Sequence, residues 1–390
     1  GALRVRGGLV LAMDRFDRIL GVDPDNMIAR AEPGVITARL QEEVECLGLF
    51  YPPDPASIRI STLGGNVAEC AGGLRAVKYG VTRDYVLGLE IVLPTGEILR
   101  TGVETAKGVV GYDLTRLVVG SEGTLAVVTK ITLRLVPRPE ARRTMLAFFD
   151  DLAAAVRTVT GLVRRKVVPT TLEFLDRVCI DCVRGEMAMA VPGDAAALLL
   201  IEVDGDDGLV ARDAERVRDV ALASGAVKFQ EARDEEEAER LWEARRNVSP
   251  ALQTLRPGKV SEDVVVPRSR LAELVSFLGP LSRRYHQPVA AFGHAGDGNI
   301  HVHILLDPDS PEETADTERI VRALFEEVIR LGGTLSGEHG VGITKAPYLD
   351  LELPEPTRSL MRRLKQAFDP NGILNPGKIF PEDLQPPPSS

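Results

Sequence analysis

The chain has 390 residues, 44% of them hydrophobic and 27% charged, and its formal net charge is -10. This length favours two domains over a single core, and the acidic balance argues against a general nucleic-acid-binding surface. No apolar run approaches the roughly 20 residues that a membrane-spanning helix needs. Four cysteines are too few for a disulfide framework, and no signal-peptide pattern is present, so we expect a reduced, cytoplasmic setting.

The first third of the chain is predicted to form strands and turns with short helices between them. Residues 36–49 predict a helix whose apolar face consists of Ile36, Leu40, Val44 and Leu47. Residues 86–102 predict a hairpin around the turn "PTGE", and residues 123–137 alternate in hydrophobicity as a long strand does. Residues 136–143, "VPRPEARR", are interpreted as a linker.

Beyond this linker, apolar strands alternate with amphipathic helices. The predicted strands are 145–149, 170–175, 197–203 and 262–267. The predicted helices are 151–165, 210–223 and 268–285. This pattern favours an α+β domain whose sheet is covered by helices on one side. The final "QPPPSS" is predicted to be disordered.

Cys179 and Cys182 form a single CxxC, and no second pair is present to complete a zinc site. We interpret them as buried or idle thiols.

Residues 52–88 are crowded with small side chains. Successive glycines let the backbone approach a flat or phosphorylated ligand closely, and exposed N–H groups in such loops bind anions. Glycine-rich loops also form plain tight turns, so this stretch alone leaves ligand binding open.

Four of the five histidines lie in two short glycine-rich stretches, "GHAGDGNIHVH" at 293–303 and "SGEHG" at 336–340. His301 and His303 alternate along a predicted strand and therefore share a face. The turn "AGDGN" folds His294 back toward them, so three imidazoles are predicted to gather in a small volume. Two imidazoles and one carboxylate, such as Glu338, form a catalytic type of metal site, although any single histidine is more often a hydrogen-bonded core or turn residue.

His339 directly follows Glu338, and adjacent side chains in an extended segment point to opposite sides. We therefore interpret His339 as a general base and not as a second ligand from this segment.

The order of these motifs resembles one family closely. "PPDP", "STLGGN", "AGGLRAVKYG", "TRDYVLGLE" and "GYDLTRLVVGSEGTLAVVTKITLRL" are followed by "GHAGDGNIHVH", "SGEHGVG" and "FDPNGILNPGK". Together they resemble the vanillyl-alcohol oxidase (PCMH-type) flavoproteins over nearly the whole chain. The likeness is strongest to the FAD-linked D-2-hydroxy-acid dehydrogenases of the glycolate oxidase and D-lactate dehydrogenase type.

The resemblance implies an α+β fold in three parts. Residues 1–137 would form the FAD-binding domain, 138–367 an α+β cap domain with an antiparallel sheet, and 368–390 a carboxyl-terminal helical segment that returns to the flavin. Members of the family begin with a small lobe that ends in a glycine-rich loop around the FAD pyrophosphate. This chain opens just beyond that loop, with "GA" as its last trace, so we expect a truncated FAD domain that binds FAD weakly or not at all.

The resemblance also implies the residues that contact FAD. They are Pro53, Asp54, Ser57, Thr62, Gly64, Gly65, Asn66, Ala71, Gly72, Gly73, Tyr79, Gly80, Val127 and Asn375.

The family's metal ligands match His294, His301 and Glu338, with zinc or manganese as the metal. His303 has no ligand role by this match and is expected to orient a ligand through a hydrogen bond. Arg245 and Lys259 match the positions that hold the substrate carboxylate. They lie in or near a charged helix whose arginines could equally be solvated or paired with neighbouring glutamates, and Arg246 is assigned to solvent.

The implied chemistry is the oxidation of a D-2-hydroxy acid, with hydride passing to FAD while the metal and His339 promote loss of the hydroxyl proton. The chain has no iron–sulfur cysteine pattern, so the electron acceptor is expected to be a separate iron–sulfur or other subunit, or a quinone. Two other hypotheses remain: a non-catalytic flavin-fold subunit or fragment, and a non-haem iron oxygenase, because two histidines and one carboxylate also suit iron.

Overall fold

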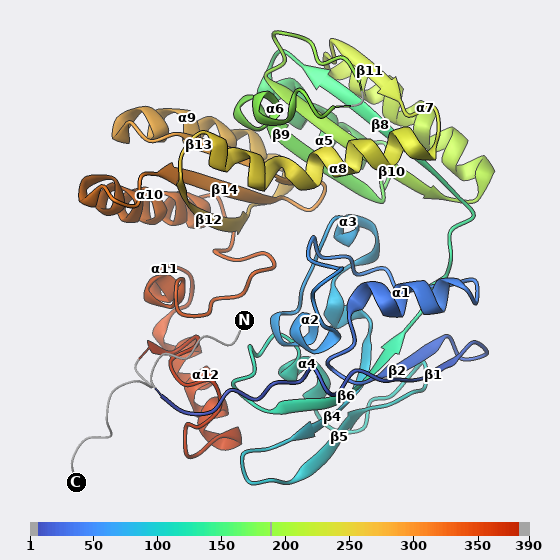
Figure 1. Cartoon of the computed structure of the whole chain (residues 1–390), viewed down its shortest axis with the longest axis vertical. Coiled ribbons are helices and arrows are strands. Elements are labelled where there is room, and N and C mark those ends of the chain that lie inside the picture. Colours follow the sequence, from blue (N-terminus) through green and yellow to red (C-terminus); the bar gives the residue numbers. More distant parts are fainter. Residues whose placement is uncertain (1–6, 188, 382–390) are drawn as a thin grey trace. The chain divides into compact units, whose positions relative to one another are not determined.

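The computed structural model describes residues 7–187 and 189–381 and divides into two compact units (Figure 1). The first unit consists of Gly1–Gly73, Gly80–Arg138 and Glu338–Ser390, and the second of Leu74–Tyr79 and Pro139–Gly337. By its contacts, the segment from Glu338 onward groups with the first unit. The domain limits expected from the sequence stay a prediction. The expected disorder of "QPPPSS" and the role given to "GA" fall outside the described residues.

The first unit is built on a five-stranded antiparallel sheet. Its strands, in spatial order, are β1 (Ile19–Asp23), β2 (Ile28–Ala31), β6 (Val127–Arg134), β4 (Val86–Val92) and β5 (Ile98–Gly102). Its helices are α1 (Thr37–Glu45), α2 (Leu63–Glu69), α4 (Leu114–Val118), α11 (Leu349–Glu352) and α12 (Glu355–Phe368). A short pair, β3 (Leu49–Phe50) with β7 (Val136–Pro137), completes it. The predicted hairpin is confirmed as β4–β5, and the predicted long strand as the shorter β6.

One expectation for this unit is wrong. Leu47 is not on the buried face of α1, because the helix ends at Glu45 and Leu47 lies in the following turn, 51% exposed. The segment 136–143, interpreted as a linker, contains the division between the two units after Arg138, although Val136 and Pro137 pair with β3 and the next strand already begins at Ala141.

The second unit is built on a seven-stranded antiparallel sheet. Its strands, in spatial order, are β11 (Lys228–Glu231), β8 (Ala141–Phe149), β10 (Ala197–Gly205), β9 (Thr171–Asp176), β13 (Val289–His294), β14 (Asn299–Leu306) and β12 (Gly258–Val265). Its helices are α3 (Ala76–Tyr79), α5 (Leu152–Arg164), α6 (Arg177–Val183), α7 (Asp207–Ser224), α8 (Glu235–Ala251), α9 (Leu271–Tyr285) and α10 (Pro311–Arg330). The predicted strands and helices of this region are all present.

Helices cover both faces of this sheet, so the expectation of a one-sided cover is wrong. Leu198 and Leu200 of β10 pack with α6 and α8, whereas Leu199 between them packs toward α5 and α9. A strand buried on both faces has a continuous apolar run and not an alternating one. The run "ALLLIEV" in β10 already carried this signal.

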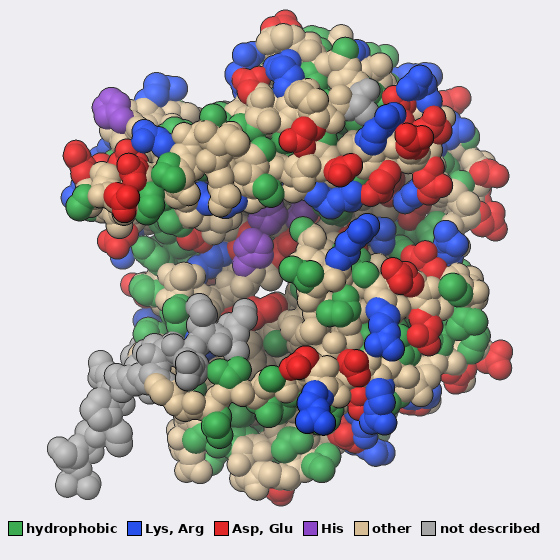
Figure 2. Space-filling model, viewed as in Figure 1, with side chains coloured by type: hydrophobic (Ala, Val, Ile, Leu, Met, Phe, Trp, Pro, Cys, Tyr) green, Lys and Arg blue, Asp and Glu red, His purple; other side chains and the backbone are tan. Residues whose placement is uncertain are grey.

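Acidic and basic side chains are intermingled on the visible face of both units (Figure 2). Among the described residues, no helix combines the length and apolar character that crossing a bilayer requires. Both observations agree with the composition of the chain.

Asp176 joins α6 to β13. Its carboxylate accepts hydrogen bonds from the Cys179 N–H (2.8 Å) at the start of α6 and from the Ala291 N–H (2.7 Å) in β13. Burial raises the pKa of Asp176 to about 6, because the loss of solvation outweighs these two hydrogen bonds.

The folded protein therefore retains a proton on Asp176 between about pH 4 and 6, whereas the unfolded chain has lost it. The stabilisation from this group is complete below about pH 4 and is lost as the pH rises through 6. As the pH rises from about 4 to 6, we expect the melting temperature of wild type to fall relative to that of Asp176→Asn. Scanning calorimetry measures both melting temperatures. Asp181→Asn, at an exposed position of α6, is the control. A difference between wild type and Asp176→Asn that is constant from pH 4 to 7 would contradict the assignment.

Candidate active site

Four neighbouring strands of the second unit carry polar side chains on one face. The register pairs Glu173 of β9 with His294 of β13, Phe292 of β13 with His301 of β14, and His301 with Asp263 of β12. Residues directly opposite each other in an antiparallel pair point to the same face. These five side chains therefore share one face of the sheet, the face that α6 and α8 cover.

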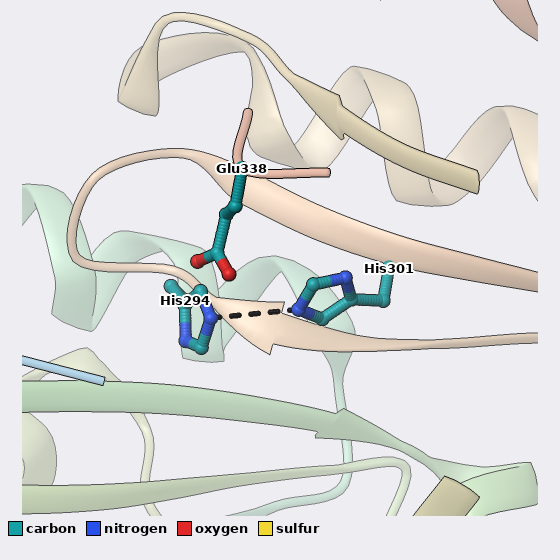
Figure 3. Close-up of side chains that lie close together, drawn as sticks. All are labelled: His294, His301 and Glu338. Atoms are coloured by element: carbon teal, nitrogen blue, oxygen red, sulfur yellow. Dashed lines mark hydrogen bonds between the residues drawn. The ribbon is translucent and has the colours of Figure 1, made fainter. Parts of the chain in front are cut away.

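The imidazoles of His294 and His301 face each other, with their Nε2 atoms 3.4 Å apart (Figure 3). Both side chains are buried. Glu338 directly follows Gly337, whose N–H donates to the Asp263 carboxylate at 2.8 Å. The Glu338 carboxylate points toward the two imidazoles, and the ligand atoms of His294, His301 and Glu338 all lie within 4.8 Å of one another.

This group fits a divalent cation in both chemistry and spacing. Two ligand nitrogens about 2.0–2.1 Å from a tetrahedral zinc ion lie roughly 3.3 Å apart, close to the 3.4 Å between the two Nε2 atoms. Two histidines and one carboxylate leave a coordination position for substrate, as catalytic sites do. His294, His301 and Glu338 could therefore hold a metal, as the sequence predicted.

Glu173 was missed by the sequence analysis, which treated it only as part of a strand. Its Oε1 lies 2.6 Å from His294 Nδ1, and its Oε2 accepts a hydrogen bond from Arg245 Nε (2.8 Å) and forms an ion pair with Arg245 Nη2 (2.5 Å). Burial alone would raise the pKa of Glu173, but the charges of His294 and Arg245, together with these hydrogen bonds, outweigh burial and lower the pKa to about 2. A single acid in the apolar run "TTLEFL" was the signal available in the sequence.

Phe292 contacts both Arg245 and His303. The Arg245 guanidinium lies 4.6 Å from the centre of the Phe292 ring, and the His303 ring stacks on that ring at 4.8 Å with an interplanar angle of 13°. His303 shares the face of His301, as predicted, but it is not part of the group that could hold a metal. The hydrogen-bonding role expected for His303 stays a prediction.

The cations predicted to hold the substrate carboxylate lie on or over this face. Arg245 is buried in α8 and pairs with Glu173 of another element, and not with a neighbouring glutamate of its own helix. Lys259 of β12 donates to the Ser249 carbonyl and hydroxyl, both at 2.7 Å, and burial lowers its pKa. Arg246 is 42% exposed and pairs with Glu239, in keeping with its assignment to solvent.

The segment that follows Glu338 is fastened within the first unit by Glu122. The Glu122 carboxylate accepts hydrogen bonds from the N–H groups of Val341 (2.6 Å) and Gly342 (2.7 Å), and its carbonyl accepts one from the Asn375 amide at 2.5 Å. Glu122, which lies in "GSEG", was not recognised as a functional residue from the sequence. This anchoring fixes the backbone two residues beyond His339, whose side chain is exposed.

The positions predicted to contact FAD fall mostly in the first unit. Those in the first unit are Pro53, Asp54, Ser57, Thr62, Gly64, Gly65, Asn66, Ala71, Gly72, Gly73, Gly80, Val127 and Asn375. Tyr79 groups with the second unit, where its hydroxyl donates to Asp204 at 2.9 Å. The Asn66 side-chain amide donates a hydrogen bond to the Thr37 hydroxyl at 2.7 Å. One of its donors is therefore already used within the protein.

Glycines bring backbone segments of this region close together. Gly73 has φ +135°, and a Cβ there would collide with the Asp54 carbonyl, so "PPDP" and "AGG" meet with no side chain between them. Thr62 caps α2 and accepts a hydrogen bond from the Gly65 N–H, and the Gly64 N–H donates to the Pro33 carbonyl. The N–H groups of both glycines therefore already have acceptors within the protein.

Comparisons with known proteins agree with this geometry. Residues 1–102 match the family described as "FAD binding domain", and residues 138–379 match "FAD linked oxidases, C-terminal domain". The glycolate oxidase subunit GlcD of Bacillus subtilis is 47% identical over 385 residues, which is 99% of this chain and 82% of that protein. The D-lactate dehydrogenase of Anaerostipes hadrus is 35% identical over 97% of this chain and 81% of its own length.

Among solved structures, p-cresol methylhydroxylase with substrate bound matches with a TM-score of 0.75, covering 94% of this chain and 78% of that one. At 19% identity this likeness concerns the fold alone, and it confirms the expected fold class. With a family match over most of its length and close relatives along nearly all of it, the chain belongs to the FAD-linked oxidases.

Proposed function

We propose that this FAD-linked oxidase is a dehydrogenase that oxidises a D-2-hydroxy acid of the glycolate or D-lactate class to the 2-oxo acid. The names of its relatives support the substrate class, since they include a glycolate oxidase subunit and a D-lactate dehydrogenase. The observation that carries the proposal is the group of His294, His301 and Glu338, whose ligand atoms lie within 4.8 Å of one another. A non-haem iron oxygenase could use the same ligands but has no need of two FAD-oxidase domains.

The charges on this face suit an anionic substrate once a dication is present. Glu173, Asp263 and Glu338 are three carboxylates, against which Arg245 and Lys259 are two cations. Three negative and two positive groups give these five side chains a net charge of -1. A bound divalent ion would change this net charge to +1. The site would then attract a 2-hydroxy acid and not repel it.

In this mechanism the residues of the chain bind the substrate and move its proton. A bound metal would lower the pKa of the hydroxyl, and FAD would accept the hydride from the α-carbon. His294, His301 and Glu338 would hold the metal, with zinc or manganese as candidates. Arg245 and Lys259 would bind the carboxylate, and a ring nitrogen of His339 would take the hydroxyl proton.

The electrons must then leave the protein. Relatives of this chain are named as subunits, which supports a separate protein as the electron acceptor, either an iron–sulfur subunit or another carrier. A non-catalytic role in such an assembly is the second hypothesis, and the retained histidine and glutamate group argues against it.

Metal binding is expected to depend on His301. The purified protein should bind about one zinc ion per chain, and His301→Ala should weaken binding at least about 100-fold because it removes one of three ligands. Isothermal titration with zinc measures this directly. His286→Asn is the matched control, because His286 is the one histidine outside the two motifs and asparagine tolerates its positive φ of 53°. Equal affinity in wild type and His301→Ala would exclude this metal site.

Proton removal is expected to depend on His339. In the FAD-loaded protein, His339→Ala should slow anaerobic flavin reduction by D-lactate or glycolate about 10²–10⁴-fold, with a much smaller change in the concentration that half-saturates the reaction. Stopped-flow absorbance of the flavin separates the two quantities, and L-lactate tests the stereochemistry. Flavin reduction at the wild-type rate in His339→Ala would show that the base is another group.

A further inference from the structure

Glu173 and Arg245 form a buried ion pair, and Glu173 contacts the ring of His294. Neither Glu173 nor Arg245 is proposed as a metal ligand. Glu173 has no exposed surface, and the Arg245 side chain is 9% exposed. A buried carboxylate is costly unless it is paired and hydrogen-bonded. Glu173 meets this condition by giving one oxygen to each partner, Oε1 to His294 and Oε2 to Arg245.

The consequence for His294 concerns its tautomer. An imidazole binds a metal in its neutral form, which carries one N–H, and the hydrogen bond made by one ring nitrogen decides which nitrogen is left for the metal. A carboxylate can only accept, so the 2.6 Å contact places the proton on Nδ1. The lone pair then lies on Nε2, the atom that faces His301 Nε2 at 3.4 Å.

We propose that Glu173 is a positioning residue for a metal site: held in place by Arg245, its carboxylate fixes the tautomer and ring orientation of His294 and so presents Nε2 to a divalent cation. This inference rests on the proposed function for the cation, but it assigns a role to a residue that contacts neither metal nor substrate. Carboxylates behind metal-binding histidines commonly act in this way.

Arg245 gives this arrangement a second property. Its Nε and Nη2 bond Glu173, so the cation expected to bind the substrate carboxylate and the histidine expected to bind the metal share one anion. Removing the Glu173 charge would weaken the contacts that hold the Arg245 guanidinium and the His294 ring in place. A simple structural role for Glu173 would instead lower stability without a selective effect on metal binding.

Glu173→Gln tests the proposal, because glutamine keeps the size of the side chain but removes its charge. We expect the affinity for zinc, measured by isothermal titration, to fall about 10–100-fold, and Glu173→Asp to recover part of the loss. Glu202→Gln is the matched control: Glu202 is another buried glutamate of the same sheet, and its bonds are to the neutral donors Thr144 and Trp242. It should bind zinc like wild type.

The outcomes separate this inference from the function on which it rests. If wild type and Glu173→Gln bind zinc equally, the role of Glu173 is wrong and the metal site stands. If wild type binds no zinc, both are wrong. If Glu173→Gln fails to fold, ¹⁵N-histidine NMR of the zinc-loaded wild type decides: a proton on Nδ1 of His294 supports the proposal, and a proton on Nε2 overturns it.

Discussion

The antiparallel register of β9, β13, β14 and β12 is the constraint on which the site depends. It places Glu173 opposite His294, and His301 opposite both Phe292 and Asp263, so that all project from one face. A shift of one residue in any of these strands would turn its polar side chains to the opposite face of the sheet. The apolar cores on both faces oppose such a shift, because each strand would then bury the wrong residues. The geometry of the site is therefore maintained by the hydrophobic packing of the whole sheet.

Buried charge is tolerated on this face because each carboxylate has specific partners. Glu173 is held by His294 and Arg245, and Asp263 accepts hydrogen bonds from the Gly337 N–H and the Ser336 hydroxyl. One carboxylate thus orients a histidine, and the other fixes the backbone just before Glu338. Gly337 is required at this point, since a Cβ would collide with the Asn299 amide. Preorganised groups of this kind bind a metal without first paying for reorganisation.

The sequence predicted those parts of the protein that depend on local pattern. The hairpin of His294 and His301 and the strand of alternate histidines were evident from turn residues and a period of two. The role of Glu338 was inferred from its flanking glycines and from the family resemblance. Glu173 and Glu122 could not be found in this way, because their partners lie at least 72 residues away in the chain. The sequence showed the charge of Arg245 but not its partner, because Glu173 lies on a strand that is distant in the chain. Helices on both sides of the sheet were also missed, although the unbroken apolar run in β10 pointed to them.

Anomalous diffraction at the zinc edge, from crystals of the zinc-loaded protein, tests the central claim most directly. The account predicts a single strong peak within about 2.0–2.2 Å of His294 Nε2, His301 Nε2 and a Glu338 oxygen, with the Glu173 carboxylate still against Nδ1. A zinc ion bound elsewhere, or bound to His294 through Nδ1, would contradict it.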